Sequence, residues 1–247
     1  MRRLNTKKVK MFAADSFVEH MSSYPAPTRK YIPEWYKRMP LFMGGGGRKG
    51  GKLEWLGSKG NNATIKACIP VFDIMTSGYI MPLPMDVLVV RDASGAAKFS
   101  WREGGSSPLI TEHDRDQIPD QMVPDEYERT PYKFSNYFHV ETPAGYSLLF
   151  THPLNRMDLP FHMISGLVDT DDYTAGINFP FFLKKGFEGL IQAGTPMVQI
   201  MPIKREPWEL EIDKKFDDDK SFMTNAPLFS RMFRGYRDHF WTKKEYN

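Results

Sequence analysis

The sequence is almost without cysteine, because Cys68 is the only one among its 247 residues. A single thiol excludes an internal disulfide and any metal site built from several cysteines. Cys68 stands beside Ile69 and Pro70, with no histidine close to it in the sequence. We therefore expect a buried and unreactive thiol.

Long apolar runs are also missing. No stretch approaches the roughly 20 apolar residues that cross a bilayer. Met1 is followed by charged and polar residues instead of the apolar core of a signal peptide. We expect a soluble, cytoplasmic protein that does not contact a membrane.

Neither sign of charge dominates, since 33 basic and 30 acidic residues leave a formal charge of +3. This balance implies no strongly charged partner for the chain as a whole. The basic residues 1–10 are interpreted as a solubilising terminus. The glycine-rich loop 44–51 lacks the P-loop pattern, because Lys52 is followed by Leu53 and by no helical periodicity. We interpret it as a mobile surface loop.

Aromatic and turn-forming residues are abundant. Aromatic residues make up 14% of the chain, and glycine and proline each occur 19 times. This composition favours short strands over long helices. Strand-like segments of five to seven residues, separated by Gly, Pro and Asp turns, predict a mainly β fold. We expect an antiparallel sandwich or a β-clip-like barrel.

Three regions are predicted along the chain. Residues 1–61 read as an extended, proline-rich arm that carries the glycine-rich loop, residues 62–212 as the β domain, and residues 213–247 as a C-terminal helical tail. Within the β domain we expect a hairpin from "DVLVVRD" to "GAAKFSWRE". "PVFDIMTSGY" reads as a strand or as a short helix that ends near Gly78. The segments of the second half are expected to pair consecutively, as hairpins.

Several motifs are shared with a known family. "ETPAGYSLLFTHPLNRMDLPF", "SGLVDTDDYTAGINFPFF" and "IQAGTPMVQIMPIKREPW" resemble an uncharacterised protein family of T4-like marine bacteriophages and some bacteria. "YIPEWYKRMP" and "CIPVFDIMTSGYIMPLP" also match it, so the resemblance spans most of residues 30–210. The family has no established function, so the resemblance implies a phage-type protein and no particular activity.

A second, local resemblance concerns the dUTPase and dCTP deaminase β-clip fold. "GLVDTDDYTAGINF" is similar to the strand–turn–strand motif that holds deoxyribose in those enzymes. The resemblance implies that Asp169 or Asp171 activates water and that Tyr173 packs under the sugar. It gives Gln199 a structural place and leaves Arg156 as the phosphate partner. The Gly-rich phosphate strand with its serine, an arginine at Met197 and the C-terminal glycine-rich arm are not found in this sequence.

The acidic turn is the first candidate site that the residues themselves indicate. Asp169, Asp171 and Asp172 could bind Mg²⁺, or could cap a tight turn through Asx-type hydrogen bonds, and the second reading is favoured. Nearby "HPLNR" is polar after an apolar strand. Arg156 is expected to pair either with Asp158 or with the carboxylates of the turn. We expect the second pairing, with Asn155 and Arg156 as ligand-binding residues and Gln199 beside them.

Histidines offer an alternative metal site. His139, Glu141 and His152 could form the two-histidine, one-carboxylate set of a non-haem Fe(II) oxygenase. In a hairpin closed by "PAG", position 139 lies four residues before Pro143 and position 152 lies seven after Gly145. This unequal spacing argues against a compact triad. His152 is therefore interpreted as bonded to a backbone carbonyl.

Function is predicted from these observations together. No complete catalytic set is present, and "NFPFFL" and "FWTKKEY" are candidate docking surfaces. We expect a phage-type accessory or assembly protein, in the cytoplasm of the host cell or in the virion. It would form a homo-oligomer or bind a virion or host protein. The alternatives are a nucleotide-processing hydrolase, with a nucleotide ligand and Mg²⁺, and an oxygenase with Fe(II).

Overall fold

The structure is a computed structural model, and it describes residues 6–42, 63–102, 108–173, 175–212 and 235–247. By its internal contacts the chain forms two units. The first unit comprises Met1–Tyr31 and Gly78–Glu206, and the second comprises Ile32–Ser77 and Pro207–Asn247. The glycine-rich loop 44–51 lies outside the described residues, as does most of the predicted C-terminal helix.

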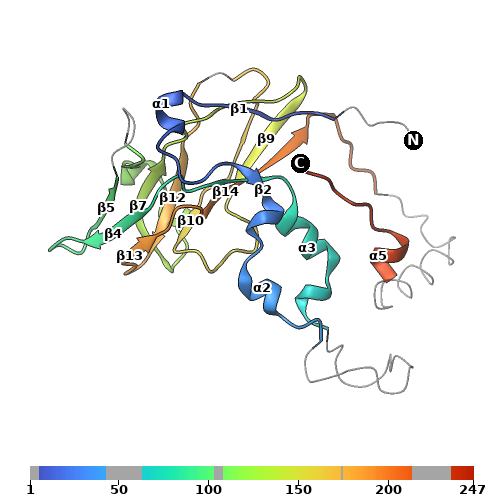
Figure 1. Ribbon diagram of the computed structural model, residues 1–247, viewed down its shortest axis with the longest axis horizontal. Helices are drawn as coiled ribbons and strands as arrows, with labels where there is room; N and C mark the ends of the chain where they lie inside the picture. The colour runs from blue at the N-terminus through green and yellow to red at the C-terminus, as the bar shows by residue number, and fades with distance from the viewer. Residues whose placement is uncertain (1–5, 43–62, 103–107, 174, 213–234) are drawn as a thin grey trace. The chain divides into compact units, whose positions relative to one another are not determined.

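The first unit is mainly β and antiparallel, as the sequence predicts (Figure 1). Its largest sheet has five strands in the order β11-β9-β14-β3-β2. A second sheet has four strands in the order β10-β12-β7-β6. The strands of these two sheets are β2 (Ala26–Pro27), β3 (Tyr79–Pro82), β6 (Ile110–Glu112), β7 (Tyr127–Phe134), β9 (Tyr146–Thr151), β10 (Phe161–Met163), β11 (Gly166–Val168), β12 (Phe179–Lys184) and β14 (Pro196–Lys204).

Two smaller sheets complete the unit. One has the order β13-β4-β5 and the other pairs β1 with β8. Their strands are β1 (Lys10–Phe12), β4 (Val87–Arg91), β5 (Ala97–Trp101), β8 (His139–Glu141) and β13 (Gly189–Ile191). The predicted β4–β5 hairpin is confirmed, with Val89 opposite Phe99. The sandwich-like arrangement is confirmed as well, and no sheet of the described residues closes into a barrel.

Consecutive pairing in the second half is wrong as a prediction. β8 pairs with β1 and not with β9, so no hairpin forms across "PAG". β11 pairs with β9, whereas β12 pairs with β10 and β7, so residues 165–183 are not a hairpin either. The chain passes back and forth between the two large sheets. This path follows from strands such as β12, whose Phe181, Phe182 and Leu183 are all buried and need apolar neighbours on both faces.

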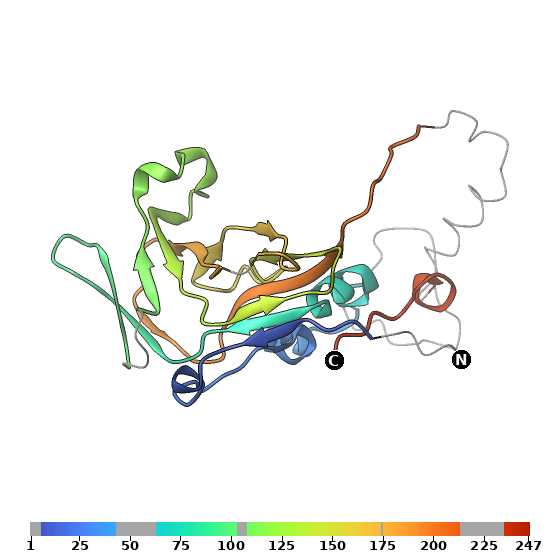
Figure 2. The same ribbon diagram turned by 90° about the horizontal axis from the view of Figure 1, so that it is seen from above.

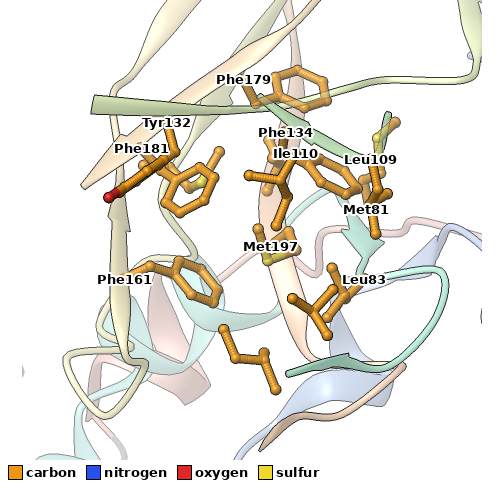
Figure 3. Close-up of a cluster of buried hydrophobic side chains, with 14 of the residues drawn as sticks. Met81, Leu83, Leu109, Ile110, Tyr132, Phe134, Phe161, Phe179, Phe181 and Met197 are labelled. Atoms are coloured by element: carbon orange, nitrogen blue, oxygen red, sulfur yellow. The ribbon is translucent and has the colours of Figure 1, made fainter. Parts of the chain in front are cut away.

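One hydrophobic core joins the sheets of the first unit. Figure 3 shows side chains from several strands meeting in it, among them Met81 and Met197 of the five-stranded sheet and Phe134, Phe161, Phe179 and Phe181 of the four-stranded sheet. Some of the aromatic rings pack edge-on, as with Phe161 and Phe181 at 6.0 Å between centroids, and others are stacked, as with Phe134 and Phe179 at 6.2 Å.

Gly78 begins the second passage of the chain through the first unit, just before β3. Its φ is +72°, and a Cβ built there would lie 2.0 Å from the carbonyl oxygen of Ile200 on β14. Only glycine fits this close approach and this left-handed backbone. Of the two readings that the sequence left open before Gly78, the short helix is the one found, as α3 (Ile69–Thr76).

The remaining helices are short. The first unit contains α1 (Asp15–Val18) and the 3₁₀ turns η1 (Thr28–Tyr31), η3 (Arg115–Gln117) and η4 (Asp120–Met122). The second unit contains α2 (Glu34–Arg38), η2 (Ile65–Ala67), α3 and α5 (Gly235–His239). No helix among the described residues has the length and apolar character of a membrane span.

Polar contacts bind the parts of the second unit together. Asp73 of α3 accepts hydrogen bonds from the indole of Trp241 at 2.8 Å and from Lys244 at 2.7 Å. Lys66 donates to the carbonyl groups of Lys37 and Met39 at the end of α2. Cys68 is half-buried at the N-terminus of α3, so it is less enclosed than expected.

Candidate functional site

The acidic bend, residues 169–173, follows β11 and is a tight turn. The backbone N–H groups of Asp172 and Tyr173 both donate to the carbonyl oxygen of Asp169, at 3.1 and 2.9 Å. Thr170 points inward and is buried, and its hydroxyl lies 2.8 Å from that of Thr142. The turn is thus fixed by its backbone and by Thr170, which leaves the aspartates for other contacts.

Asp171 forms an ion pair with Arg205, the residue after β14. Nη1 of Arg205 donates to Oδ1 of Asp171 at 2.8 Å, and Nη2 donates to Oδ2 in a second, short hydrogen bond. The backbone N–H of Gly145 also donates to Oδ2, at 2.8 Å. This forked geometry, with only 9% of the Asp171 side chain exposed, is the strong form of an arginine–carboxylate pair.

Asp169 shares the same guanidinium. The hydroxyl of Ser147 donates to its carboxylate at 2.6 Å, and Nη1 of Arg205 lies 3.2 Å from it. Ser147 is fully buried, whereas 63% of the Asp169 side chain is exposed. The like charges of the bend are therefore neutralised by one cation from a distant strand. The expectation that Arg156 is this cation is wrong.

Strand register explains why Arg205 reaches the bend. β14 and β9 are neighbours with Lys204 opposite Tyr146, and β9 and β11 are neighbours with Val168 opposite Leu148. The next residues, Arg205 and Asp169, are therefore delivered to the same end of the sheet, on either side of Ser147. The backbone N–H of Arg205 donates to the carbonyl of Gly145 at 2.8 Å, which fixes the backbone from which the Arg205 side chain extends.

These contacts set the ionisation of the pair. The hydrogen bonds from Arg205, and then the one from Gly145, lower the pKa of Asp171 from 3.8 to about 2. The hydrogen bond to Asp171 likewise raises the pKa of Arg205. Because the folded pKa is depressed, the stabilisation is present above pH 3.8 and is lost as pH falls through about 2.

A carboxylate with this environment has little capacity for proton transfer or metal binding. Asp171 is ionised near neutral pH, and both its oxygens already accept hydrogen bonds. Mg²⁺ ligation by the bend is therefore not what the geometry favours. The aspartates do not cap their own turn as expected, since Asp169 and Asp171 bond to Ser147, Gly145 and Arg205. Asp172 and Tyr173 are exposed.

Arg156 lies at the other end of β9, beyond Thr151. Its guanidinium makes a forked pair with Asp158, at 2.8 and 2.9 Å, which is the first of the two pairings that the sequence left open. Nη1 also donates to the carbonyl of Tyr31 at 3.2 Å. Only 12% of its side chain is exposed. Arg156 therefore fixes a loop and does not contact the bend.

The other predicted ligand-binding residues belong to the same loop. Asn155 has φ of 62°, a left-handed conformation that asparagine tolerates better than most residues. The buried side chain of Gln199 accepts a hydrogen bond from the N–H of Leu154 at 2.9 Å. Gln199 thus supports the loop through its side-chain oxygen. Asn155, Arg156 and Gln199 are brought together, as loop supports.

His152 is buried beneath this loop. Its Nε2 donates to the carbonyl of Arg156 at 3.0 Å, and its Nδ1 accepts from the N–H of Met163 at 3.4 Å. The predicted carbonyl partner is therefore confirmed. Burial lowers the pKa of His152 from 6.5 to about 4, against a smaller opposite effect of the carbonyl bond. The ring packs at a tilt against that of His162, with centroids 4.6 Å apart.

The Fe(II) triad is not assembled. His139 and Glu141 lie on β8, with their side chains 3.3 Å apart, and His139 stands opposite Phe12 of β1. Both nitrogens of His152 are already used elsewhere. Within the described ranges no group of three His, Cys, Asp or Glu side chains could hold a metal ion. The register argument from the sequence assumed a hairpin across "PAG" that does not form.

A second feature of interest is the 207–212 segment of the second unit, which was not among the residues predicted from the sequence to form a site. Trp208, Leu210 and Ile212 are 79–88% exposed and alternate with Glu209 and Glu211. The segment is extended and contains no helix or strand (Figure 2). Three large apolar side chains so fully exposed on one short segment are unusual.

Comparisons with known proteins add no name to these features. No family model matches the chain, and no curated protein matches it. The resemblances to the phage family and to the β-clip enzymes therefore stay predictions.

Proposed function

We propose that the chain is a phage-type accessory or assembly protein that acts by binding another protein through exposed apolar surface. The observation that carries the proposal is the 207–212 segment. Its three large apolar side chains, Trp208, Leu210 and Ile212, each stand almost free of contacts. Burying one such side chain is worth about 1.5–3 kcal/mol, so a partner that covers all three gains substantially.

The polar groups favour binding over catalysis. The aspartates of the acidic bend are paired with Arg205 and Ser147. His152, whose pKa is lowered to about 4 by burial, uses both ring nitrogens. Groups held in this way maintain strand ends and loops. The apolar side chains of the 207–212 segment, by contrast, are exposed and available to contact a partner.

The proposal is tested by capture from lysates of infected and uninfected host cells. Wild-type protein is compared as bait with a variant carrying Trp208→Ser, Leu210→Ser and Ile212→Ser. The control variant carries Met122→Ser, Met157→Ser and Leu167→Ser, which remove three other exposed apolar side chains from the first unit. A binding role predicts proteins retained by wild type and control and lost from the 208/210/212 variant. Equal recovery with all three baits, together with a monomeric wild type, contradicts it.

A nucleotide-processing hydrolase is the second candidate, favoured by one observation. Asp169 and Tyr173 are both exposed on the same turn, beside a guanidinium that is itself 40% exposed. A nucleotide at 100 times its dissociation constant would raise the free energy of unfolding by about 2.7 kcal/mol. Thermal shifts with dUTP and dCTP, each with Mg²⁺, would then be seen for wild type and lost in Asp169→Asn. No shift for wild type at millimolar nucleotide removes this candidate.

A further inference from the structure

Strand β5 is an open edge of the first unit. It stands last in the order β13-β4-β5, so among the described residues it has a hydrogen-bonded neighbour on one side only. β5 lies at one end of the first unit in both views (Figures 1 and 2). Its five residues, "AKFSW", contain no proline and no charge pointing inward. Such an edge is a ready template for another strand.

The two faces of β5 differ in character. Ala97, Phe99 and Trp101 face the core, and the Phe99 ring packs against Tyr132 at 4.7 Å between centroids. Phe99 and Trp101 are only half-buried, so the apolar face continues to the open edge. Lys98 and Ser100 are exposed on the other face, and Arg102 after the strand is also exposed. The edge therefore has one apolar side and one basic side.

The 207–212 segment has the matching pattern. In an extended strand successive side chains point to opposite faces. Trp208, Leu210 and Ile212 would form one face, and Glu209 and Glu211 the other. A five-residue run that is apolar on one side and acidic on the other is complementary to an edge of the same length that is apolar and basic.

We propose that the 207–212 segment of one copy of this chain adds as a strand to the β5 edge of a second copy. The three apolar side chains extend the row of Phe99 and Trp101. Glu209 and Glu211 lie beside Lys98 and Arg102. This proposal rests on the proposed binding function and names its partner, because both halves of the complementary pair are present in this one sequence.

Hydrogen bonding and charge both favour the 207–212 segment as the strand that adds to β5. Main-chain hydrogen bonds supply the affinity of strand addition, and the alternating side chains supply its specificity. Lys98 is 3.6 Å from Asp92, with 60% of its side chain exposed, so it remains accessible to a second carboxylate. Reciprocal exchange between two copies would make the contact twice, which closes a twofold dimer.

Disulfide cross-linking tests the register and the partner together. In a Cys68→Ser background, full-length chains carrying Ser100→Cys are mixed with chains carrying Glu209→Cys or Glu211→Cys and oxidised. Facing residues of paired strands lie within the Cα range of a disulfide, about 4.4–6.8 Å. A heterodimer is expected from same-face pairs. Leu210→Cys with Ser100→Cys, on opposite faces, is the matched control and should yield about tenfold less or none.

Reversing the charges on the two strands distinguishes the β5 proposal from the more general proposal that the chain binds another protein. By sedimentation velocity, Glu209→Lys with Glu211→Lys should weaken self-association at least about tenfold, as should Lys98→Glu with Arg102→Glu. Combining all four changes in one chain should restore it to within about threefold. The same-face cysteine pairs, each placed together in one chain, test whether the segment docks on its own edge.

Three outcomes would overturn the β5 proposal. If the wild type is monomeric up to about 100 μM, its self-association is too weak for a specific interface. Association without rescue by the charge exchange places the contact elsewhere. A cross-link confined to single chains shows docking within one copy. In the first two cases the proposed binding function stands if a lysate partner is lost with the 208/210/212 variant, and falls if it is not.

Discussion

The acidic bend of the first unit and the 207–212 segment of the second unit differ in how their side chains are used. In the bend, the charged side chains are paired with one another within the chain, with Arg205 bonded to Asp171 and close to Asp169. In the segment, large apolar side chains are left uncovered. The conspicuous charges of this sequence thus stabilise the fold, and the residues that a fold would normally bury are left for a partner.

The largest loss of stability is expected at Gly78, where the backbone packs closely against β14. Gly78→Ala places a methyl group against the carbonyl of Ile200 at a left-handed φ of +72°. We expect the free energy of unfolding in urea to fall by roughly 3–5 kcal/mol. Gly95→Ala is the control, because its φ is +83° but nothing lies within 4 Å of the added carbon. It should lose only about 1–2 kcal/mol, and equal losses would show that the Ile200 contact is unimportant.

A loss of similar size is expected from acid acting on His152. Its pKa is about 4 in the folded chain against 6.5 as the ordinary value. Stability is therefore complete above pH 6.5 and falls as pH drops towards 4, by about 3 kcal/mol. The groups around the ring are His162, Arg156 and Asp158. Of these, His162 also has a lowered pKa.

The measurement is the urea unfolding free energy between pH 7 and 4 for wild type, His152→Gln and His162→Gln. The curve of His152→Gln should be flatter than that of wild type. The curve of His162→Gln should keep most of the slope. If His152→Gln parallels wild type, the buried neutral histidine does not control acid sensitivity.

A moderate effect is expected at the acidic bend. Ser147→Ala removes the buried hydroxyl that donates to Asp169 and accepts from Arg205 at 3.1 Å. We expect a loss of about 1 kcal/mol, the usual net value of such hydrogen bonds. Ser100→Ala on exposed β5 is the control and should change stability by less than about 0.5 kcal/mol. An unchanged Ser147→Ala protein would mean that the bend is not held through this residue.

The smallest effect on stability is expected from the segment itself. Replacing Trp208, Leu210 and Ile212 by serine removes side chains that contact little. The unfolding free energy of the monomer, measured at low micromolar concentration, should change by less than about 0.5 kcal/mol. A loss above about 2 kcal/mol would show that these residues are part of a core.

Local pattern was enough to predict much of the fold but not its pairing. The β4–β5 hairpin, the helix before Gly78 and the antiparallel β character follow from short-range alternation and turn residues. Which strands pair is decided by packing between distant segments. β12 looks as though it should pair with β11, but burial on both faces places it between β10 and β7. No local sequence pattern indicates that β12 pairs with β10 and β7.

The candidate site shows the same limit. The sequence identified the aspartates of the bend and their need for a cation, and it identified the carbonyl partner of His152. It chose Arg156 because that residue is nearer in the chain. Arg205 is the cation because β14 lies beside β9 and β9 beside β11, which is a property of the sheet. An arginine directly after a long apolar strand was the one available signal.

Hydrogen–deuterium exchange of the full chain over a dilution series tests the central claim most directly. If the 207–212 segment adds to β5 of a second copy, amides in residues 207–212 and in β5 are protected together at high concentration and lose protection together on dilution. Neither change should occur in the variant with serine at positions 208, 210 and 212. Rapid exchange of residues 207–212 at every concentration, in the presence of lysate proteins as well as alone, would contradict it.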